Sequence, residues 1–211
     1  MNKKNLLIGS ALVLAALLVV GGTMAWFTAA ADPVPNKFTA GTVKIVLHDV
    51  QTGENGEEIP FPDEGIGNVN PGDEYEKIVY VENTGSKAVY VRVKLTPGWK
   101  DDEGNSLALE VGTPAVPMAT FPIVGDKWVL HTDGWYYYTE PLAGAGDNVA
   151  NAVTTHLIEK VKFAGAEMTN DYQGATFTLK VEAEAVQASH KAYKDEWGSD
   201  IDFLTPYPAT P

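Results

Sequence analysis

The sequence contains no cysteine and few basic residues. The absence of cysteine excludes disulfide bonds, thiol nucleophiles and cysteine-based zinc sites, so the fold must rest on burial alone. There are 15 Lys and Arg residues against 28 Asp and Glu, which gives a formal net charge of −13. So acidic a chain repels nucleic acid and anionic lipid, and we expect neither as a partner.

The first residues have the pattern of a secretory signal peptide. Two lysines near the N-terminus precede the uncharged apolar run 6–20, and small residues follow it. Thr23 and Ala25 occupy the minus-three and minus-one positions, where a signal peptidase accepts only small side chains. We therefore predict a signal peptide over residues 1–25, with cleavage between Ala25 and Trp26.

Cleavage would make this a secreted protein and would change its charge. The removed segment carries two lysines and no acid, so the net charge of the mature chain would be −15. Ala29–Ala31 offers a second small-x-small site for a later cut. The alternative is an uncleaved membrane anchor, because an apolar run of about 20 residues spans a bilayer. On the cleavage hypothesis, the protein meets the membrane only before its signal is removed.

Alternation of apolar and polar residues predicts β-strands along the rest of the chain. A period of two places alternate side chains on one face of a strand. The segments with this pattern are 43–47, 75–81, 89–95, 157–163 and 177–185, and a shorter strand is expected at 107–111.

Two pairs of segments predict β-hairpins. The first pair is 75–81 and 89–95, which a turn-like stretch separates. The second is 128–132 and 135–139, both aromatic and β-branched, joined by Asp133–Gly134. That dipeptide is typical of a two-residue type I′ turn.

At least seven strands and no long amphipathic helix indicate one all-β domain. We predict an antiparallel jelly-roll-like β-sandwich over residues 40–188, with an immunoglobulin-like sandwich as the alternative topology. Residues 26–39 form an extended N-terminal segment on this hypothesis. Residues 189–211 form a C-terminal tail, with a short helix at 189–197 and a proline-rich extended end from Thr205.

Three separated pieces of the sequence match one family, in the family's order. They are GGTMAWFT from Gly21 with FTAGTVKIVL from Phe38, NVNPGD from Asn68 with VENTGSKAVYVRVKL from Val81, and NDYQGATFTLKVEAEAVQ from Asn170. Together they resemble the TasA/camelysin family of secreted proteins of Gram-positive bacteria.

The resemblance implies a precursor cut by a dedicated signal peptidase and a jelly-roll-like sandwich that is secreted or held at the cell surface. TasA itself assembles into biofilm-matrix fibres, in which the N-terminal segment of one subunit completes a sheet of the next. We therefore expect a structural subunit or accessory of an extracellular matrix or surface fibre. Its partners would be further copies of itself and other matrix or fibre proteins.

Cleavage after Ala25 would expose a new N-terminus suited to this assembly. Main-chain hydrogen bonds along a neighbour's sheet edge would give affinity, and two aromatic anchors, each contributing roughly 1.5–3 kcal/mol, would set the register. Pro33 and Pro35 cannot donate to a ladder and would lie on a linker. The alternative is that the aromatic pair packs on its own domain. The candidate assembly residues are Trp26, Phe27, Thr28, Ala29, Ala30 and Ala31.

A camelysin-type cell-surface metalloendopeptidase is the alternative function. Zinc peptidases of this kind hold two histidines one helical turn apart with a glutamate between them. The four histidines, at 48, 131, 156 and 190, are far apart in sequence. His156 and Glu159 come nearest, but residues three apart in a strand point to opposite faces. We therefore predict no catalytic residue, no cofactor-binding residue and no metal ligand.

Two further features have a binding interpretation beside a structural one. Acidic clusters at 54–58, 63–64 and 101–103 offer oxygen ligands for calcium, but they lack EF-hand spacing, and we interpret them as loop tips. In the run 135–138, alternate aromatic side chains face opposite ways, so one pair belongs to the core. The outward pair would suit a surface adhesion or glycan-binding module, the second alternative function.

Overall fold

The computed structural model describes residues 41–144 and 151–207. The predicted signal peptide, the cleavage residues Thr23, Ala25 and Trp26, and the assembly segment 26–31 lie outside the described residues.

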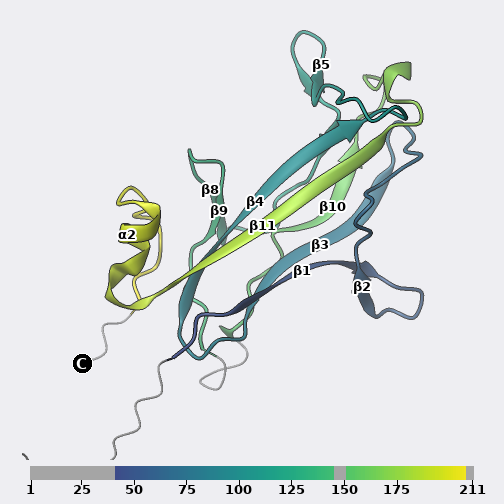
Figure 1. The fold of residues 1–211 in the computed structure, drawn as a ribbon. Coiled ribbons are helices and arrows are strands. Elements are labelled where there is room, and N and C mark those ends of the chain that lie inside the picture. Colours follow the sequence, from purple (N-terminus) through teal and green to yellow (C-terminus); the bar gives the residue numbers. More distant parts are fainter. Residues whose placement is uncertain (1–40, 145–150, 208–211) are drawn as a thin grey trace, which may run out of the picture. The chain divides into compact units, whose positions relative to one another are not determined.

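Two antiparallel β-sheets pack against each other (Figure 1), which confirms a mostly β fold with two layers. The first sheet contains β1 (Ile45–Thr52), β2 (Glu58–Pro60), β3 (Glu74–Asn83), β7 (Ala119–Thr120) and β10 (Ile158–Phe163). The second contains β4 (Val89–Lys100), β8 (Trp128–Leu130), β9 (Tyr136–Tyr138) and β11 (Thr176–Gln187). The strand orders are β2-β1-β3-β10-β7 and β11-β4-β9-β8. The remaining elements are a ribbon of β5 (Glu110–Val111) and β6 (Val116–Pro117), the 3₁₀ turns η2 (Asn170–Tyr172) and η3 (Ser189–Lys191), and the helix α2 (Ala192–Trp197).

The core lies between the two sheets and follows the alternation seen in the sequence. In β3, Val79 and Val81 are fully buried, while Tyr80 between them is more exposed. In β4, Val91 and Val93 face them from the other sheet, and Trp99 fills the far end of the same layer. Burying one face of each strand is what the period of two requires.

The predicted hairpin between 75–81 and 89–95 is wrong. These segments form β3 and β4, which belong to different sheets and do not pair. The side-chain amide of Asn83 donates to the carbonyl oxygens of Lys87 and Ala143, both at 2.8 Å, and so anchors the connection where the chain crosses between the layers. Alternation determines which face of a strand is buried, but the partner of the strand is a separate choice.

The second predicted hairpin is confirmed, but its turn is of a different type. β8 and β9 pair as expected. The loop has three residues, because His131 N donates to Trp135 O at 2.9 Å and Gly134 N donates to His131 O at 3.0 Å. Gly134, with φ of +81°, takes the left-handed position that ends such a loop.

The C-terminal segment packs on the outer face of the four-stranded sheet. The predicted helix at 189–197 is present in part: η3, which contains positive φ angles at His190 and Lys191, leads directly into the helix α2. The Tyr90 hydroxyl donates to Thr205 O at 2.7 Å and accepts from Tyr207 N at 2.8 Å. A second apolar cluster forms under this segment, of Tyr90, Tyr137, Val186, Ala188, Ile201 and Leu204.

Candidate functional site

One flank of the sandwich leaves the edges of both sheets unpaired within the described part of the chain. We call it the open flank and define it by residues 45–48 of β1 and 178–187 of β11, which lie side by side (Figure 1). β2 pairs with β1 only from Val50 onward. On the side of β11 away from β4, the described residues make one bridge, between Phe177 and Ile66.

The hydrogen-bonding groups of β11 point into the open flank at every second residue. Ile66 N donates to Phe177 O at 2.8 Å, and Phe177 N donates to Ile66 O at 2.9 Å. Because these groups alternate in direction along a strand, they point to the same side at Leu179, Val181, Ala183 and Ala185. At the other end, Ala188 N donates to Ala88 O on the β4 side, as the same alternation requires.

β1 presents its backbone groups in the same way. Phe61 N donates to Asp49 O at 2.9 Å from the β2 side of the strand. The N–H and C=O groups of Leu47 and Ile45 therefore face the open flank as well. Unpaired edges of this kind accept an added strand.

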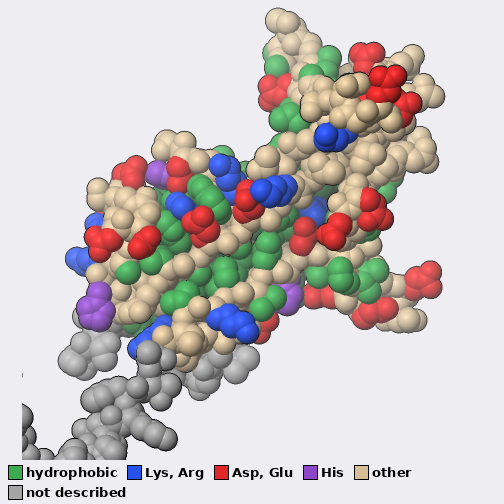
Figure 2. All heavy atoms as spheres, in the orientation of Figure 1, with side chains coloured by type: hydrophobic (Ala, Val, Ile, Leu, Met, Phe, Trp, Pro, Cys, Tyr) green, Lys and Arg blue, Asp and Glu red, His purple; other side chains and the backbone are tan. Residues whose placement is uncertain are grey.

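The floor of the open flank is apolar. Five half-buried side chains from the two edges pack against the main core: Ile45, Leu47, Val181, Ala183 and Ala185. Figure 2 shows hydrophobic side chains gathered in the region between β11 and β1, with charged side chains around them. Two strand edges over an apolar floor provide what β-strand addition needs, which is main-chain partners and places for alternate side chains.

A polar pocket of about 300 Å³ lies at one end of the open flank. Lys77 lines it with Asp49, Asp63 and Phe61, and only 2% of the lysine is exposed. Its Nζ atom lies 2.5 Å from Asp49 Oδ1 and 3.8 Å from the centre of the Phe61 ring. Burial lowers the pKa of Lys77, and the two carboxylates oppose that shift.

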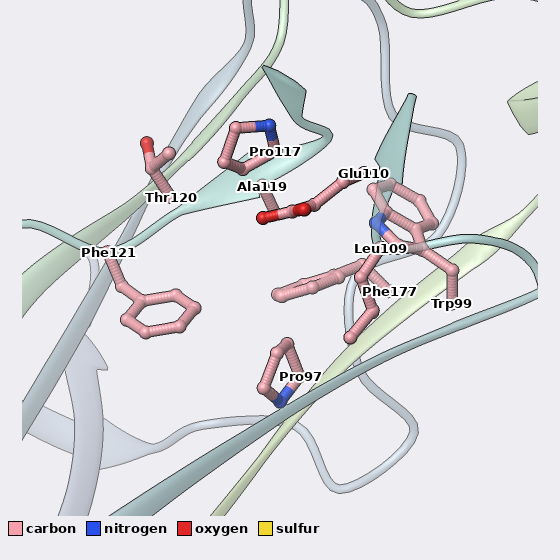
Figure 3. A pocket seen from close by; sticks show the side chains of 9 residues that line it. All are labelled: Pro97, Trp99, Leu109, Glu110, Pro117, Ala119, Thr120, Phe121 and Phe177. Atoms are coloured by element: carbon pink, nitrogen blue, oxygen red, sulfur yellow. The ribbon is translucent and has the colours of Figure 1, made fainter. Parts of the chain in front are cut away.

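A second pocket, of about 320 Å³, is mostly apolar (Figure 3). Pro97, Trp99, Phe121 and Phe177 provide much of its wall, and Glu110 contributes the one carboxylate. Among the described residues, Nε1 of the buried Trp99 has no hydrogen-bond partner. The pocket has room for one apolar side chain or ring, and nothing in the structure assigns its occupant.

Two of the four histidines, His48 and His156, pair with carboxylates on the outer face of the five-stranded sheet. His48 stacks on Tyr80, with ring centroids 4.3 Å apart, and its Nε2 lies 3.1 Å from Glu82. The expectation that His156 and Glu159 point apart is wrong, because Nδ1 and Oε1 lie 2.9 Å apart. His156 precedes β10, and the register of β10 shifts just after the strand begins. Within the ranges described, no group of three His, Asp or Glu residues is placed to hold a metal ion.

In the acidic loop at 101–103, the carboxylate of Asp101 accepts hydrogen bonds from the loop's own backbone. Asp101 Oδ1 accepts from the backbone N–H groups of Asn105 at 2.7 Å and Glu103 at 3.1 Å. Hydrogen bonds, led by that of the Asn105 side chain, lower the pKa of Asp101. This geometry is typical of a loop tip in which Asp organises the turn.

Both aromatic pairs of the run 135–138 are used in packing. Tyr138 and Tyr136 join the main core. Tyr137 is fully buried under the C-terminal segment, with Trp197 and Phe203 against its ring. The outward pair predicted from alternation is therefore largely covered by the chain itself.

Arg92 fastens the C-terminal segment to the sheet. Its guanidinium lies 4.4 Å from the Trp135 ring and 4.9 Å from the Trp197 ring. It donates to Glu184 at 2.7 Å and 3.0 Å, and to the Tyr137 hydroxyl at 2.8 Å.

Replacing Arg92 by alanine is expected to lower the free energy of unfolding by about 2 kcal/mol, because stacking, hydrogen bonds and apolar packing are lost together. Arg92→Lys is expected to recover only part of the lost stability, since an ammonium group cannot stack on an aromatic ring or donate two parallel hydrogen bonds as a planar guanidinium does. Urea denaturation measures both. The control is Lys94→Ala. Because the Nζ atom of Lys94 is 5.8 Å from the Trp135 ring, this substitution is expected to change the free energy of unfolding little. Equal effects of the two alanine variants would contradict this account.

No helix in the described ranges is long and apolar enough to cross a membrane. A comparison with protein-family models and with curated proteins finds no match for this chain.

Proposed function

We propose that this protein is an exported structural subunit, or an accessory subunit, of an extracellular matrix or surface fibre. Subunits join head to tail when the N-terminal segment 26–31 of one copy adds as a strand to the open flank of the next. The observation that carries the proposal is the open flank itself, where two sheet edges meet over an apolar floor. The resemblance of the three sequence pieces to the TasA/camelysin family points in the same direction.

The β11 edge is the acceptor that fits best. From Leu179 to Ala185 it offers four sets of outward backbone groups, and its two alanines leave room for a neighbour's side chains. A donated strand of six residues spans about 20 Å, which matches that edge. The eight residues 32–39 reach about 25 Å when extended, enough to bridge to an adjacent copy.

Head-to-tail addition does not close on itself, so it yields filaments. Export would then control assembly, because cleavage after Ala25 creates the free end that is donated. The same segment remains attached to the signal peptide in the precursor.

Deleting residues 26–31 from the mature protein is expected to abolish filaments that otherwise form with rising concentration. The deletion removes both the backbone partners and the two aromatic anchors, while residues 41–207 remain intact. Negative-stain electron microscopy and sedimentation measure the outcome. A matched control replaces the six residues with a Gly/Ser segment of equal length, which keeps the linker and is also expected to remain monomeric. Filaments that persist in both variants would refute strand donation.

Two side assays separate the alternatives. Digestion of casein that a chelator stops would favour the camelysin-type peptidase. Saturable binding to glycan without self-association would favour the adhesion module. We expect neither result, and mass spectrometry of the mature N-terminus would test the predicted cut.

A further inference from the structure

Lys77 is a buried amine on the core side of a strand. Along β3 it shares its face with Val79 and Val81, both of which are fully buried. Asp49 lies opposite Val79 in the register of β1 and β3, so it is the diagonal neighbour of Lys77 on that face. This placement brings the two functional groups to 2.5 Å, Nζ to Oδ1.

The amine of this pair is deeply buried, and the carboxylate is partly exposed. Lys77 is 3% exposed at its side chain and Asp49 is 31% exposed, with the Phe61 ring over the amine. Burial disfavours the charged form of an amine and lowers the pKa of Lys77. Proton transfer across the 2.5 Å contact, from the ammonium to the carboxylate, would give the two neutral reactants. A neutral lysine is a nucleophile, and a neutral carboxyl group is its electrophile.

We propose that Lys77 and Asp49 condense to form an intramolecular isopeptide bond between β3 and β1. The Lys77 Nζ lone pair attacks Cγ of the protonated Asp49 side chain, and a C–N bond forms. The C–O bond to the hydroxyl group then breaks, and one water molecule leaves. The product is a neutral amide, and the reaction needs no oxidant, reductant or cofactor.

Asp63 is placed to move the proton. It lines the same pocket as Lys77 and Asp49, and its charge acts on Lys77. Its carboxylate accepts a proton from the attacking nitrogen and returns it to the hydroxyl group that departs as water. The pocket, of about 300 Å³, gives the water a way out. Lys180, the other cation lining the pocket, lies on β11 and is exposed.

The bond would link the two strands at the base of the open flank and close the chain between residues 49 and 77. A covalent link of this kind restricts the unfolded state and resists mechanical separation of the strands. The proposal does not depend on fibre assembly, because all three side chains belong to one copy.

Intact-mass spectrometry of the folded mature protein tests the proposal. The expected mass is that of the sequence less one water, and digestion is expected to release a branched peptide containing Lys77 and Asp49. Lys77→Arg keeps the charge but removes the nucleophile, and should show the full mass. Asp49→Asn should give the same branched product with loss of ammonia instead of water. Asp63→Asn should slow or stop the reaction with the fold retained, as circular dichroism would show.

Two results would overturn the proposal. One is the full mass for wild-type protein, without a branched peptide, after prolonged incubation in the folded state. The other is a lost water that survives in Lys77→Arg, which would place the dehydration elsewhere, for example as a succinimide at Asp133–Gly134. Because mass is read on the wild-type chain first, misfolding of a variant cannot hide the answer.

Discussion

Replacing Ala183 by proline is expected to stop filament assembly while the monomer stays folded. The N–H of Ala183 points into the open flank, so proline removes a donor that an added strand needs. It removes no hydrogen bond to β4, because the N–H groups that face β4 belong to the alternate residues, as at Ala188. Edge strands tolerate proline for this reason. Sedimentation and electron microscopy report assembly, and thermal unfolding reports the monomer.

A matched control lies on the opposite edge of the same sheet. Leu130 in β8 is 58% exposed, and its backbone groups point away from β9, since the flanking residue His131 is the one that bonds across the hairpin. Leu130→Pro therefore removes an outward donor from an edge outside the open flank, and normal filaments are expected. If both proline variants abolish assembly, or neither does, the β11 edge is not the acceptor. If the Ala183→Pro variant does not fold, Ala185→Pro provides the same test, because the N–H of Ala185 also points into the open flank.

Replacing Trp99 by alanine is expected to cost about 3–5 kcal/mol in the free energy of unfolding, the range for deleting a buried indole. Trp99 is 1% exposed. Its ring contacts Phe163, Tyr172 and Phe177 at centroid distances of 5.1–5.3 Å. Domains are typically stable by only about 5–15 kcal/mol, so this loss should lower the midpoint of unfolding markedly.

Trp99→Phe distinguishes packing from hydrogen bonding at the same position. Because Nε1 has no partner within the described residues, losing the indole N–H forfeits no hydrogen bond there. The phenylalanine variant should therefore cost only about 1–2 kcal/mol, for the volume lost. Chemical denaturation measures both variants. A phenylalanine variant as unstable as the alanine variant would contradict this account.

The long strands could be predicted from the sequence because alternation is a local property. β1, β3, β4, β10 and β11 overlap the segments that alternate. β2, β6 and β7 have only two or three residues each, too few to show a period, and the strand expected at 107–111 shrinks to Glu110–Val111. Such short strands form because the edges of neighbouring strands supply their hydrogen bonds. A local sequence pattern carries no information about those neighbours.

The candidate site could likewise be predicted only in part. The family resemblance implied strand addition by residues 26–31, but the acceptor edge could not be located in advance. It depends on β11 lying at the edge of one sheet and on β2 covering only part of β1 in the other. The contact between Lys77 and Asp49 could not be predicted either. Asp49 precedes Lys77 by 28 residues, and in the sequence it has the pattern of an ordinary surface acid.

The buried face of each long strand, the position of the β8–β9 hairpin and the absence of disulfides could all be predicted from the sequence. Local periodicity, turn residues and composition are enough for these. Three features required the three-dimensional structure: β3 and β4 lie in opposite sheets, the C-terminal segment covers Tyr137, and Lys77 contacts Asp49. Each of these depends on contacts between residues far apart in the chain, and such contacts are chosen by the packing of the whole core rather than by any local pattern.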